Sequence, residues 1–299
     1  MNGIKVMNNL ISYLMNVLVN RLIKRLVKPL IKSLFLIFPI LCLANGKLLA
    51  TPGVSQIEGS AGGGLVPWAQ LAGYATEDEI AAAAFCSQTN LRDFQLNSCG
   101  GQVNLYNRLE LSFAKQTFNV DPLSLTLSQQ IVGLKLRLYG DVIYGKLPQL
   151  SIGGQHKSLL TPDVAESLGS RSDTGVDVYL AASKLHLGLL SGYNVLWNIT
   201  ARYTKANELG LLGFGGEHNQ SSINTEASVA ILLNKHLAIG TEYRQKPDNL
   251  RLKEDDWRDI FIAWFPNKHL NLTLAYLDLG AIAAVPNQTG WYFSISGAL

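Results

Sequence analysis

The sequence predicts an all-β protein, an antiparallel transmembrane β-barrel of about 12 strands that follows an N-terminal signal peptide. Three observations predict it. Apolar and polar residues alternate with period two along most of the chain. From Ile80 onward no apolar stretch is long enough for a membrane-spanning helix. The composition is 47% hydrophobic and only 16% charged, below the roughly 25% charged residues of soluble domains.

The first 46 residues have the layout of an export signal. They contain basic residues and no Asp or Glu, and they end in an uncharged run, 33–46. A membrane-spanning helix needs about 20 apolar residues, whereas a signal-peptide core needs roughly 7–15. Ala44 and Gly46 offer small residues for cleavage. We therefore expect a signal peptide over 1–46 and a single β-barrel domain over 47–299.

Other interpretations of the N-terminal segment stay open. Cys42 could be a lipoprotein acceptor, although Leu41 stands where a small residue is expected. Residues 8–32 could instead form a permanent amphipathic membrane helix. The candidate start residues are Met1, Met7 and Met15.

Export determines the expected state of the cysteines. Cys86 and Cys99 remain after cleavage, an even number in an oxidising compartment. They flank the polar, turn-like run 88–93, so two strands that meet at this turn would place them opposite each other. We expect a disulfide between them, with two unpaired buried thiols as the alternative. Too few further ligands lie nearby in the sequence for a metal site.

The strands follow from alternation between turn signals. In 131–139, four apolar residues alternate with a polar set that includes Lys135 and Arg137. One short helix is expected over 161–168, where Pro162 suits the first helical position. The expected strands are 65–74, 79–88, 95–105, 108–113, 131–139, 147–157, 174–187, 195–203, 225–233, 236–246, 257–265, 270–276 and 288–299.

The spacing of these strands favours a barrel in a membrane. One strand occurs about every 20 residues, which suits spanning strands of about 9–11 residues plus turns. A soluble sandwich would turn every 8–12 residues. Within lipid, strands can satisfy their backbone groups only in a closed barrel. The apolar faces would then contact lipid, and the mixed charges of the polar faces would form a salt-bridged filling of the lumen. The expected lumen-facing charged residues are Arg108, Glu110, Lys135, Arg137, Asp177, Arg202, Glu226, Glu242 and Arg244.

The expected partners are outer-membrane lipid and the barrel-assembly machinery. The last segment, 288–299, alternates up to Leu299 and resembles the assembly signal of outer-membrane barrels, which usually ends in an aromatic residue. Nucleic acid is excluded as a partner, because without residues 1–46 the chain is mildly acidic and no basic stripe with interleaved aromatics appears.

Several segments resemble a proteobacterial family known as domain of unknown function 3034. They are 53–68, 204–207 with 210–216, 242–250 and 263–269, and the resemblance runs from about residue 51 to the end. The resemblance implies an exported, barrel-like protein. The family has no assigned reaction, so it transfers no functional residue.

Sequence motifs for catalysis are weak. The histidines form no HExxH pair, and no GxSxG motif is present, although a Ser–His–acid triad needs no such proximity. The glycines of 210–216 lack the Lys-Ser/Thr of a phosphate loop, and those of 59–64 indicate a bend or a close backbone approach. The acidic cluster 253–256 with Asp259 could hold a divalent cation but is expected to be a solvated loop. The histidines are His156, His186, His218, His236 and His269.

The leading hypothesis is a non-enzymatic barrel of the bacterial outer membrane, either a narrow channel for a small solute or a structural barrel, with no cofactor and no metal. One alternative is a barrel enzyme that acts on lipid or peptide, with a histidine as base. The other is a soluble periplasmic β-sandwich that binds a small ligand.

Overall fold

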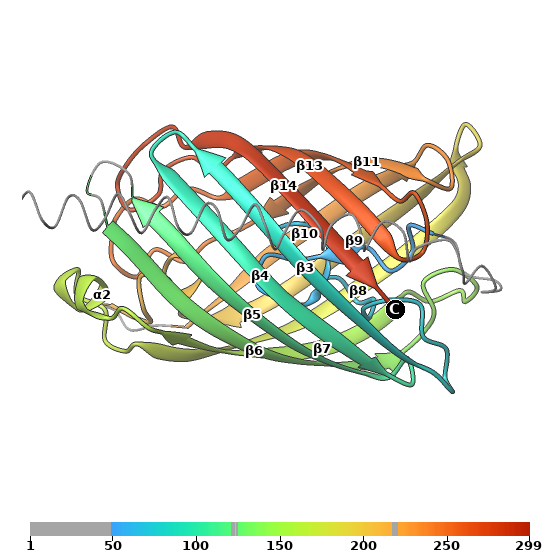
Figure 1. Ribbon diagram of the computed structural model, residues 1–299, viewed down its shortest axis with the longest axis horizontal. Helices are drawn as coiled ribbons and strands as arrows, with labels where there is room; N and C mark the ends of the chain where they lie inside the picture. The colour runs from blue at the N-terminus through green and yellow to red at the C-terminus, as the bar shows by residue number, and fades with distance from the viewer. Residues whose placement is uncertain (1–48, 121–122, 124, 217–220) are drawn as a thin grey trace, which may run out of the picture. The chain divides into compact units, whose positions relative to one another are not determined.

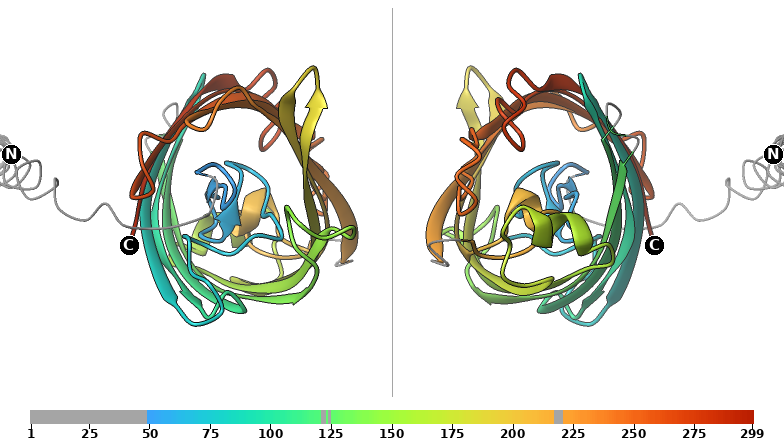
Figure 2. Two further views of the ribbon diagram at one scale, coloured as in Figure 1. Left: turned by 90° about the vertical axis from the view of Figure 1, so that its right-hand side faces the viewer. Right: turned by 90° about the vertical axis from the view of Figure 1, so that its left-hand side faces the viewer.

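The computed structural model describes residues 49–120, 123, 125–216 and 221–299. The expected signal peptide over 1–46 therefore lies outside the described residues. Twelve antiparallel strands close into a barrel (Figures 1 and 2). Each strand pairs with its neighbours in the sequence, and the last pairs with the first, so the predicted fold class is confirmed. The barrel strands are β3 (Ile80–Leu91), β4 (Phe94–Leu105), β5 (Leu109–Val120), β6 (Leu125–Tyr139), β7 (Gln149–Leu159), β8 (Thr174–Leu190), β9 (Tyr193–Thr204), β10 (Ser222–Leu232), β11 (Leu237–Arg244), β12 (Trp257–Trp264), β13 (Leu270–Asp278) and β14 (Thr289–Ala298).

The apolar residues that alternate with polar residues along each strand lie on the outer face of the barrel. Leu111 and Phe113 on β5 are 44% and 45% exposed, and Ile260 on β12 is 63% exposed. The alternate positions point inward and are mostly buried and polar. A closed ring with an apolar outside and a polar inside is the architecture of outer-membrane barrels. The predicted location in the bacterial outer membrane is thus confirmed, and the alternative of a soluble sandwich of two stacked sheets is wrong.

The two ends of the barrel differ in the length of their connections. Short turns such as 106–108 and 191–192 lie at the end where β3 begins and the chain ends, which we call the turn end. Long connections such as 205–221 and 245–256 lie at the opposite end, the loop end. In outer-membrane barrels short turns are periplasmic and long loops extracellular. This assigns the turn end to the periplasm.

Residues 49–79, which we call the plug, lie inside the barrel. Figure 2 shows this segment, in blue, within the ring of strands. It contains the short strands β1 (Val54–Ser55) and β2 (Ala61–Gly62), which pair with each other. The plug enters and leaves at the turn end, where the Tyr74 hydroxyl donates a hydrogen bond to the Leu49 carbonyl. The expected strand 65–74 is wrong, because its apolar residues pack against the inside of the wall instead of joining it.

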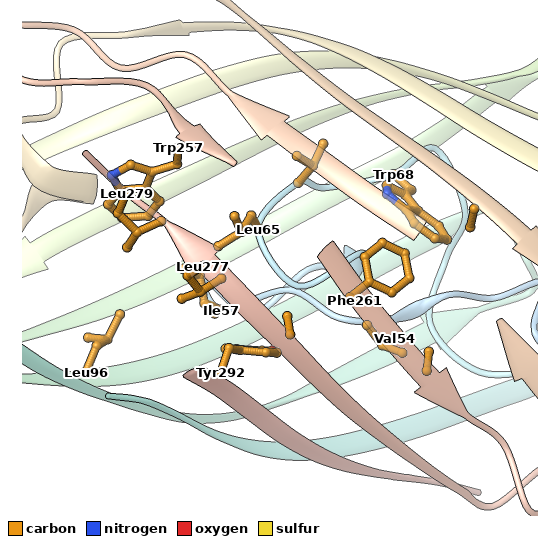
Figure 3. Packing of buried hydrophobic residues seen from close by; sticks show 14 of the residues in the cluster. Val54, Ile57, Leu65, Trp68, Leu96, Trp257, Phe261, Leu277, Leu279 and Tyr292 are labelled. Atoms are coloured by element: carbon orange, nitrogen blue, oxygen red, sulfur yellow. The ribbon is translucent and has the colours of Figure 1, made fainter. Parts of the chain in front are cut away.

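The hydrophobic core lies between the plug and the wall. Ile57, Leu65 and Trp68 of the plug belong to one buried cluster with inward side chains of the strands (Figure 3). On the loop-end side the same cluster includes Leu209 and Leu211 of the connection between β9 and β10, which contains the 3-10 helix η2 (Glu208–Gly210). Plug and connection together fill the barrel interior at this level.

Two strands extend far beyond the ranges that the sequence predicted. β5 continues to Val120 and β6 begins at Leu125, whereas the alternation indicated 108–113 and 131–139. Beyond Phe113 the outward positions of β5 become polar, with Lys115 and Thr117, so the contrast between the two faces disappears although the pairing continues. The expected helix over 161–168 is present as the shorter α2 (Asp163–Ser167). Among the residues that the structure describes, no helix is long and apolar enough to cross a bilayer.

Candidate functional site

The contact between plug and wall is the candidate functional site, and glycines let the plug approach closely. A Cβ at Gly63 would lie 1.9 Å from Oε1 of Glu242 on β11. Gly59 has a φ of +103°, a conformation that residues with a side chain rarely adopt. The glycine-rich run 59–64 is therefore a bend with close backbone approach, as its composition indicated.

The structure places seven of the expected lumen charges inside the barrel and two elsewhere. Arg108 is exposed in the turn between β4 and β5, because β5 begins one residue later than the alternation suggested. Arg137 lies at the rim of the turn end, where it donates to the Gly140 carbonyl and lies 3.5 Å from Asp141. Buried inside are Glu110, Lys135, Asp177, Arg202, Glu226, Glu242 and Arg244.

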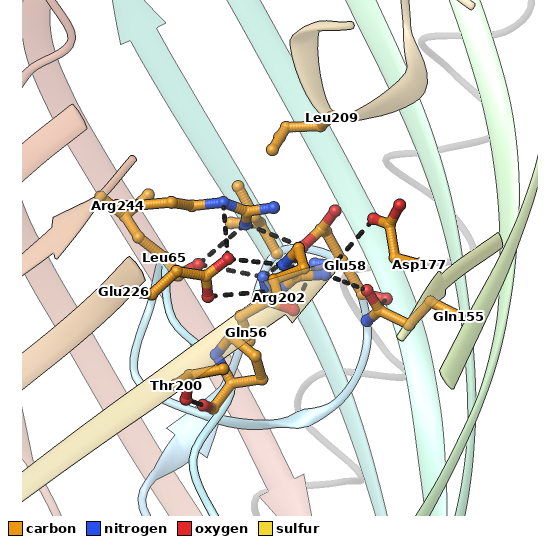
Figure 4. Close-up of polar contacts among 12 residues, drawn as sticks. Gln56, Glu58, Leu65, Gln155, Asp177, Thr200, Arg202, Leu209, Glu226 and Arg244 are labelled. Atoms are coloured by element: carbon orange, nitrogen blue, oxygen red, sulfur yellow. Dashed lines mark hydrogen bonds and ion pairs between the residues drawn. The ribbon is translucent and has the colours of Figure 1, made fainter. Parts of the chain in front are cut away.

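Six buried charged residues form what we call the central cluster (Figure 4): Glu58 of the plug and Lys157, Asp177, Arg202, Glu226 and Arg244 of the wall. Oε2 of Glu58 lies 2.7 Å from Nη1 of Arg244 and 3.4 Å from Nη2 of Arg202. Its Oε1 pairs with Nζ of Lys157.

The remaining carboxylates of the central cluster bridge neighbouring wall cations. Asp177 lies 2.7 Å from Lys157, and Glu226 lies 2.5 Å from Nε of Arg202 and 3.5 Å from Nε of Arg244. Three cations thus face three carboxylates, with almost no exposure to solvent. Buried charges are costly unless they are paired and hydrogen-bonded. The plug supplies one member of this balanced set.

A second pair of wall charges holds the plug backbone near the turn end. The two carboxylate oxygens of Glu110 accept hydrogen bonds from the amides of Ala61 and Ala72, at 3.0 and 2.8 Å. Nζ of Lys135, which lies 3.3 Å from Glu110, donates to the carbonyls of Ala61 and Gln70. One acid and one base therefore satisfy plug amides and carbonyls together.

Glu242 on β11 makes a third attachment. Its Oε2 accepts from the Leu65 amide at 2.7 Å, and its Oε1 accepts from the Ser228 hydroxyl at 2.7 Å. The Glu242 amide donates to Oδ1 of Asp259 on β12 at 2.9 Å. The same Ser228 oxygen accepts a hydrogen bond from the indole of Trp68. The bend of the plug thus presents backbone N–H to a wall carboxylate.

Uncharged wall side chains satisfy the plug carbonyls. The Ile57 carbonyl accepts from Ser98 and Gln116, at 2.6 and 2.7 Å. The Ala69 carbonyl accepts from Gln149 and Ser151, both at 2.6 Å. A chain buried inside a barrel has no water for its backbone groups, so these donors make burial of the plug possible.

The hollows around the plug are small. One lined by Gly53, Trp68 and Phe261 and another lined by Ile57, Leu65 and Leu209 each have a volume of about 20 Å³. Such a space holds a water molecule but no solute. A larger hollow of about 280 Å³ lies at the turn end beside Leu49 and Tyr193.

A separate group at the loop end, the cap cluster, consists of Lys246, Glu208 and Glu254. Nζ of Lys246 lies 2.6 Å from Glu208 and 2.8 Å from Glu254, and 5.0 Å from the ring of Trp257. Burial, followed by the neighbouring Glu208 carboxylate, raises the pKa of Glu254 to about 9. Burial alone would lower the pKa of Lys246, but the two carboxylates raise it.

Residues considered for catalysis or metal binding do not gather in the lumen. His156 and His186 lie on the outer surface, and the Nδ1 atoms of His236 and His269 lie beside the carbonyls of Phe265 and Ala298. His218 lies outside the described residues. In the described ranges, no three His, Cys, Asp or Glu side chains are placed to hold a metal ion. In the acidic cluster 253–256, Glu254 pairs with Lys246, and Asp255 and Asp256 accept hydrogen bonds from the Ala281 amide and the Tyr243 hydroxyl.

The cysteines lie on the outer face. Cys86 and Cys99 are directly opposite each other on β3 and β4 and form the expected disulfide. Both are exposed, so the alternative of two buried thiols is wrong. The bond reinforces the first hairpin of the barrel, next to the β14–β3 pairing that closes the ring.

Sequence reasoning missed two central residues, Glu58 and Lys157. Glu58 is the one charged residue in 48–76, and a lone acid in an apolar, glycine-rich segment was a usable signal. Lys157 lies an even number of residues from Gln149 and Ser151 on β7, so all three side chains point inward. The sequence placed Lys157 at the very end of its predicted strand. Two of the segments that carry the family resemblance, 53–68 and 242–250, meet around these two residues. Leu209, which lies between the segments 204–207 and 210–216, accepts a hydrogen bond from Lys157.

Solved structures with a similar arrangement include bacterial outer-membrane barrels. The NanC porin has 11% sequence identity and a TM-score of 0.44, covering 73% of this chain and 98% of the porin. The KdgM porin has 8% identity and a TM-score of 0.45, covering 72% and 98%. Omp33 of Acinetobacter baumannii has 7% identity and a TM-score of 0.45, covering 75% and 100%. Identities this low say nothing about function.

No curated protein matches the chain. Residues 51–296 match the family described as "Protein of unknown function (DUF3034)". Because this match covers most of the chain, including the plug from residue 51 on and all the barrel strands from β3 to β13, the protein belongs to the DUF3034 family.

Proposed function

We propose that this protein is an outer-membrane channel for a small solute and that the plug is its gate. The observation that supports the proposal is that the lumen is lined with polar and charged side chains, yet it is filled by a separate stretch of chain. A barrel with a purely structural role could fill its interior with side chains from the strands themselves. This wall instead offers donors and acceptors that water could also satisfy.

The type of contact matters for opening. When the plug leaves, water can replace hydrogen bonds such as those from Ser98 and Gln149 to its carbonyls, because such exchanges cost little net free energy. The apolar contacts that must be given up belong mainly to Ile57, Leu65 and Trp68. The wall left behind would be a polar pore, as in porins.

A structural barrel is the second candidate. It is favoured by the central cluster, in which every charge is paired and buried, since one lost partner in such a set costs about 3–5 kcal/mol. In this alternative the plug is a permanent part of the core.

We also propose that residues 1–46 are removed as a signal peptide, which leaves 47–299 as one barrel domain. In addition, we propose that β14 is the contact for the barrel-assembly machinery. Its outward Trp291, Phe293 and Ile295 and its pairing with β3, which closes the ring, support this.

Conductance of the purified barrel in planar bilayers tests the channel proposal. Residues 53–73 can be replaced by a short Gly-Ser link, because Pro52 and Tyr74 line the same hollow at the turn end. We expect rare, short openings for the natural chain and continuous conductance for the shortened one. Glu58→Gln should open more often than the natural chain, and the exposed Glu77→Gln is its control. A shortened barrel that folds but does not conduct would establish the structural alternative.

A further inference from the structure

The charges of the central cluster alternate around the wall from strand to strand. Lys157, Arg202 and Arg244 lie on β7, β9 and β11, and we call them the cation arc. Asp177 and Glu226 lie on the intervening β8 and β10 and pair with the cations on either side. Within this set the wall alone carries three cations and two carboxylates. These five wall residues therefore have one positive charge more than they can pair among themselves.

The plug meets this surplus with one carboxylate that uses both of its oxygens. Oε1 of Glu58 pairs with Lys157 on one side, and Oε2 contacts Arg244 and Arg202 on the other. Gln56 of the plug adds a hydrogen bond of 2.7 Å to Oε2. Glu58 has no exposure to solvent. The cation arc is thus a complete carboxylate-binding site that is occupied by the chain's own carboxylate.

Other lumen carboxylates do not replace Glu58. Glu242 accepts hydrogen bonds from the Leu65 amide and Ser228, and Glu110 pairs with Lys135. No ion pair between either of them and the cation arc is found in the described residues. If Glu58 withdrew with nothing in its place, an unpaired positive charge would stay behind in the lumen, which is costly. An anion that took its place would remove that cost.

We propose that the cation arc binds a carboxylate-bearing solute and that Glu58 is an internal stand-in which this solute displaces. The inference rests on the proposed gated channel and names its substrate class. Solute and plug compete for one site, so the solute binds only the form in which Glu58 has left. A ligand that binds one of two forms shifts the population toward that form. Arrival of an anionic solute would therefore release the plug.

Hydrogen exchange of the plug tests this in the natural protein. Amide exchange of residues 53–73 is measured in detergent micelles with sodium citrate as the probe and with sodium chloride at equal ionic strength as the reference. We expect exchange of these amides to be at least about tenfold faster in saturating citrate, which corresponds to about 1.4 kcal/mol. Amides of β12 and β13 should not change. Equal exchange in citrate and chloride would overturn the proposal.

Lys157→Met shows whether the effect depends on the cation arc. The variant leaves the wall part of the central cluster with two cations and two carboxylates, so the surplus positive charge is gone. We expect the citrate effect to disappear, whereas Lys235→Met, which changes an exposed turn residue, should retain it. A full citrate effect in Lys157→Met would mean that citrate acts elsewhere and would overturn the proposal.

Glu58→Ala offers an independent readout, because it vacates the carboxylate position. Sodium acetate should raise the melting temperature of this variant by several degrees relative to acetamide of the same shape. Equal effects of acetate and acetamide would overturn the proposal. If this variant does not fold, the exchange experiment on the natural chain decides.

These measurements do not require conduction. A citrate effect without any conductance would support the carboxylate site and refute the channel. Conductance of the shortened barrel without a citrate effect would support the channel and refute the carboxylate site. Failure of the inference and failure of the proposed function are therefore distinguishable.

Discussion

The central cluster and the cap cluster are both buried groups of cations and carboxylates, but they differ in charge balance. The central cluster joins plug to wall and pairs three cations with three carboxylates. The cap cluster joins two loop-end connections and offers one cation, Lys246, to two carboxylates, Glu208 and Glu254. In the second case burial, followed by the neighbouring Glu208 carboxylate, raises the pKa of Glu254, so that this carboxyl group keeps a proton.

Because of this difference, the plug and the loop-end connections are held in place in different ways. The charges of a balanced cluster are all paired without a proton, so its stability depends on keeping each partner in place. An unbalanced cluster responds to pH near neutrality. We therefore expect the stability of the plug to depend on the ion pairs of the central cluster and the stability of the cap cluster to depend on pH.

The largest expected effect comes from Glu58→Gln, which breaks the balance of the central cluster. Removal of one partner from a buried ion pair costs about 3–5 kcal/mol, because the opposite charges are left unpaired. The free energy of plug opening, measured by amide exchange of 53–73, should fall by about that amount. The control Glu77→Gln, in an exposed position at the end of the plug, should change it little. If both variants behave alike, the central cluster does not hold the plug.

Lys246→Met should have a smaller effect, because one of the two carboxyl groups beside it, Glu254, already keeps a proton at neutral pH. Glu208 and Glu254 lose their cation, and we expect loss of about 1–3 kcal/mol in the stability of the cap at neutral pH. Protease sensitivity of the connection 245–256 measures it. A loss as large as that of Glu58→Gln would remove the distinction between the two clusters.

The pH dependence of the cap in the natural protein is expected to be the smallest effect when it is expressed for a change of one pH unit. Folded Glu254 keeps its proton up to about pH 9, whereas in the unfolded state it loses the proton above its ordinary pKa of 4.5. The folded state thus binds more protons between these values, and cap stability falls as pH rises, by at most about 1.4 kcal/mol per pH unit. The raised pKa of Lys246 also stabilises the cap. This contribution is fully present below the ordinary pKa of 10.5 and changes only above it, so it adds no pH dependence within this window.

Protease sensitivity of 245–256 between pH 6 and pH 8 provides the measurement. In Glu254→Gln this protease sensitivity should not change with pH over this range. In Glu166→Gln, which changes an exposed residue on α2, it should change with pH as in the natural protein. A slope that survives Glu254→Gln would assign the proton to another group.

Most of the wall could be predicted from the sequence. Twelve of the thirteen expected strands are present, since inward and outward residues differ in polarity wherever one face meets lipid. The expected strand 65–74 was wrong, and two of its residues, Pro67 and Gly73, had argued against a strand. Its apolar residues are buried, as the pattern indicated, but against the inside of the barrel.

The candidate site was only partly predictable. The parity of each strand identified inward charges such as Arg202, Glu226 and Arg244, but not what they pair with. Glu58 lies 186 residues before Arg244 in the chain, and Leu65 lies 177 residues before Glu242. No local pattern connects positions so far apart.

The sequence by itself determined that the chain forms a closed barrel and which side of each strand meets lipid, because alternation is a property of neighbouring residues and is imposed by the two environments of a membrane barrel. Only the tertiary structure decided that residues 49–79 lie inside the lumen and that Glu58 pairs with the cations of the wall. That outcome depends on whether a separate segment fits the enclosed space and satisfies its buried charges, and this is settled only when all strands have closed around it.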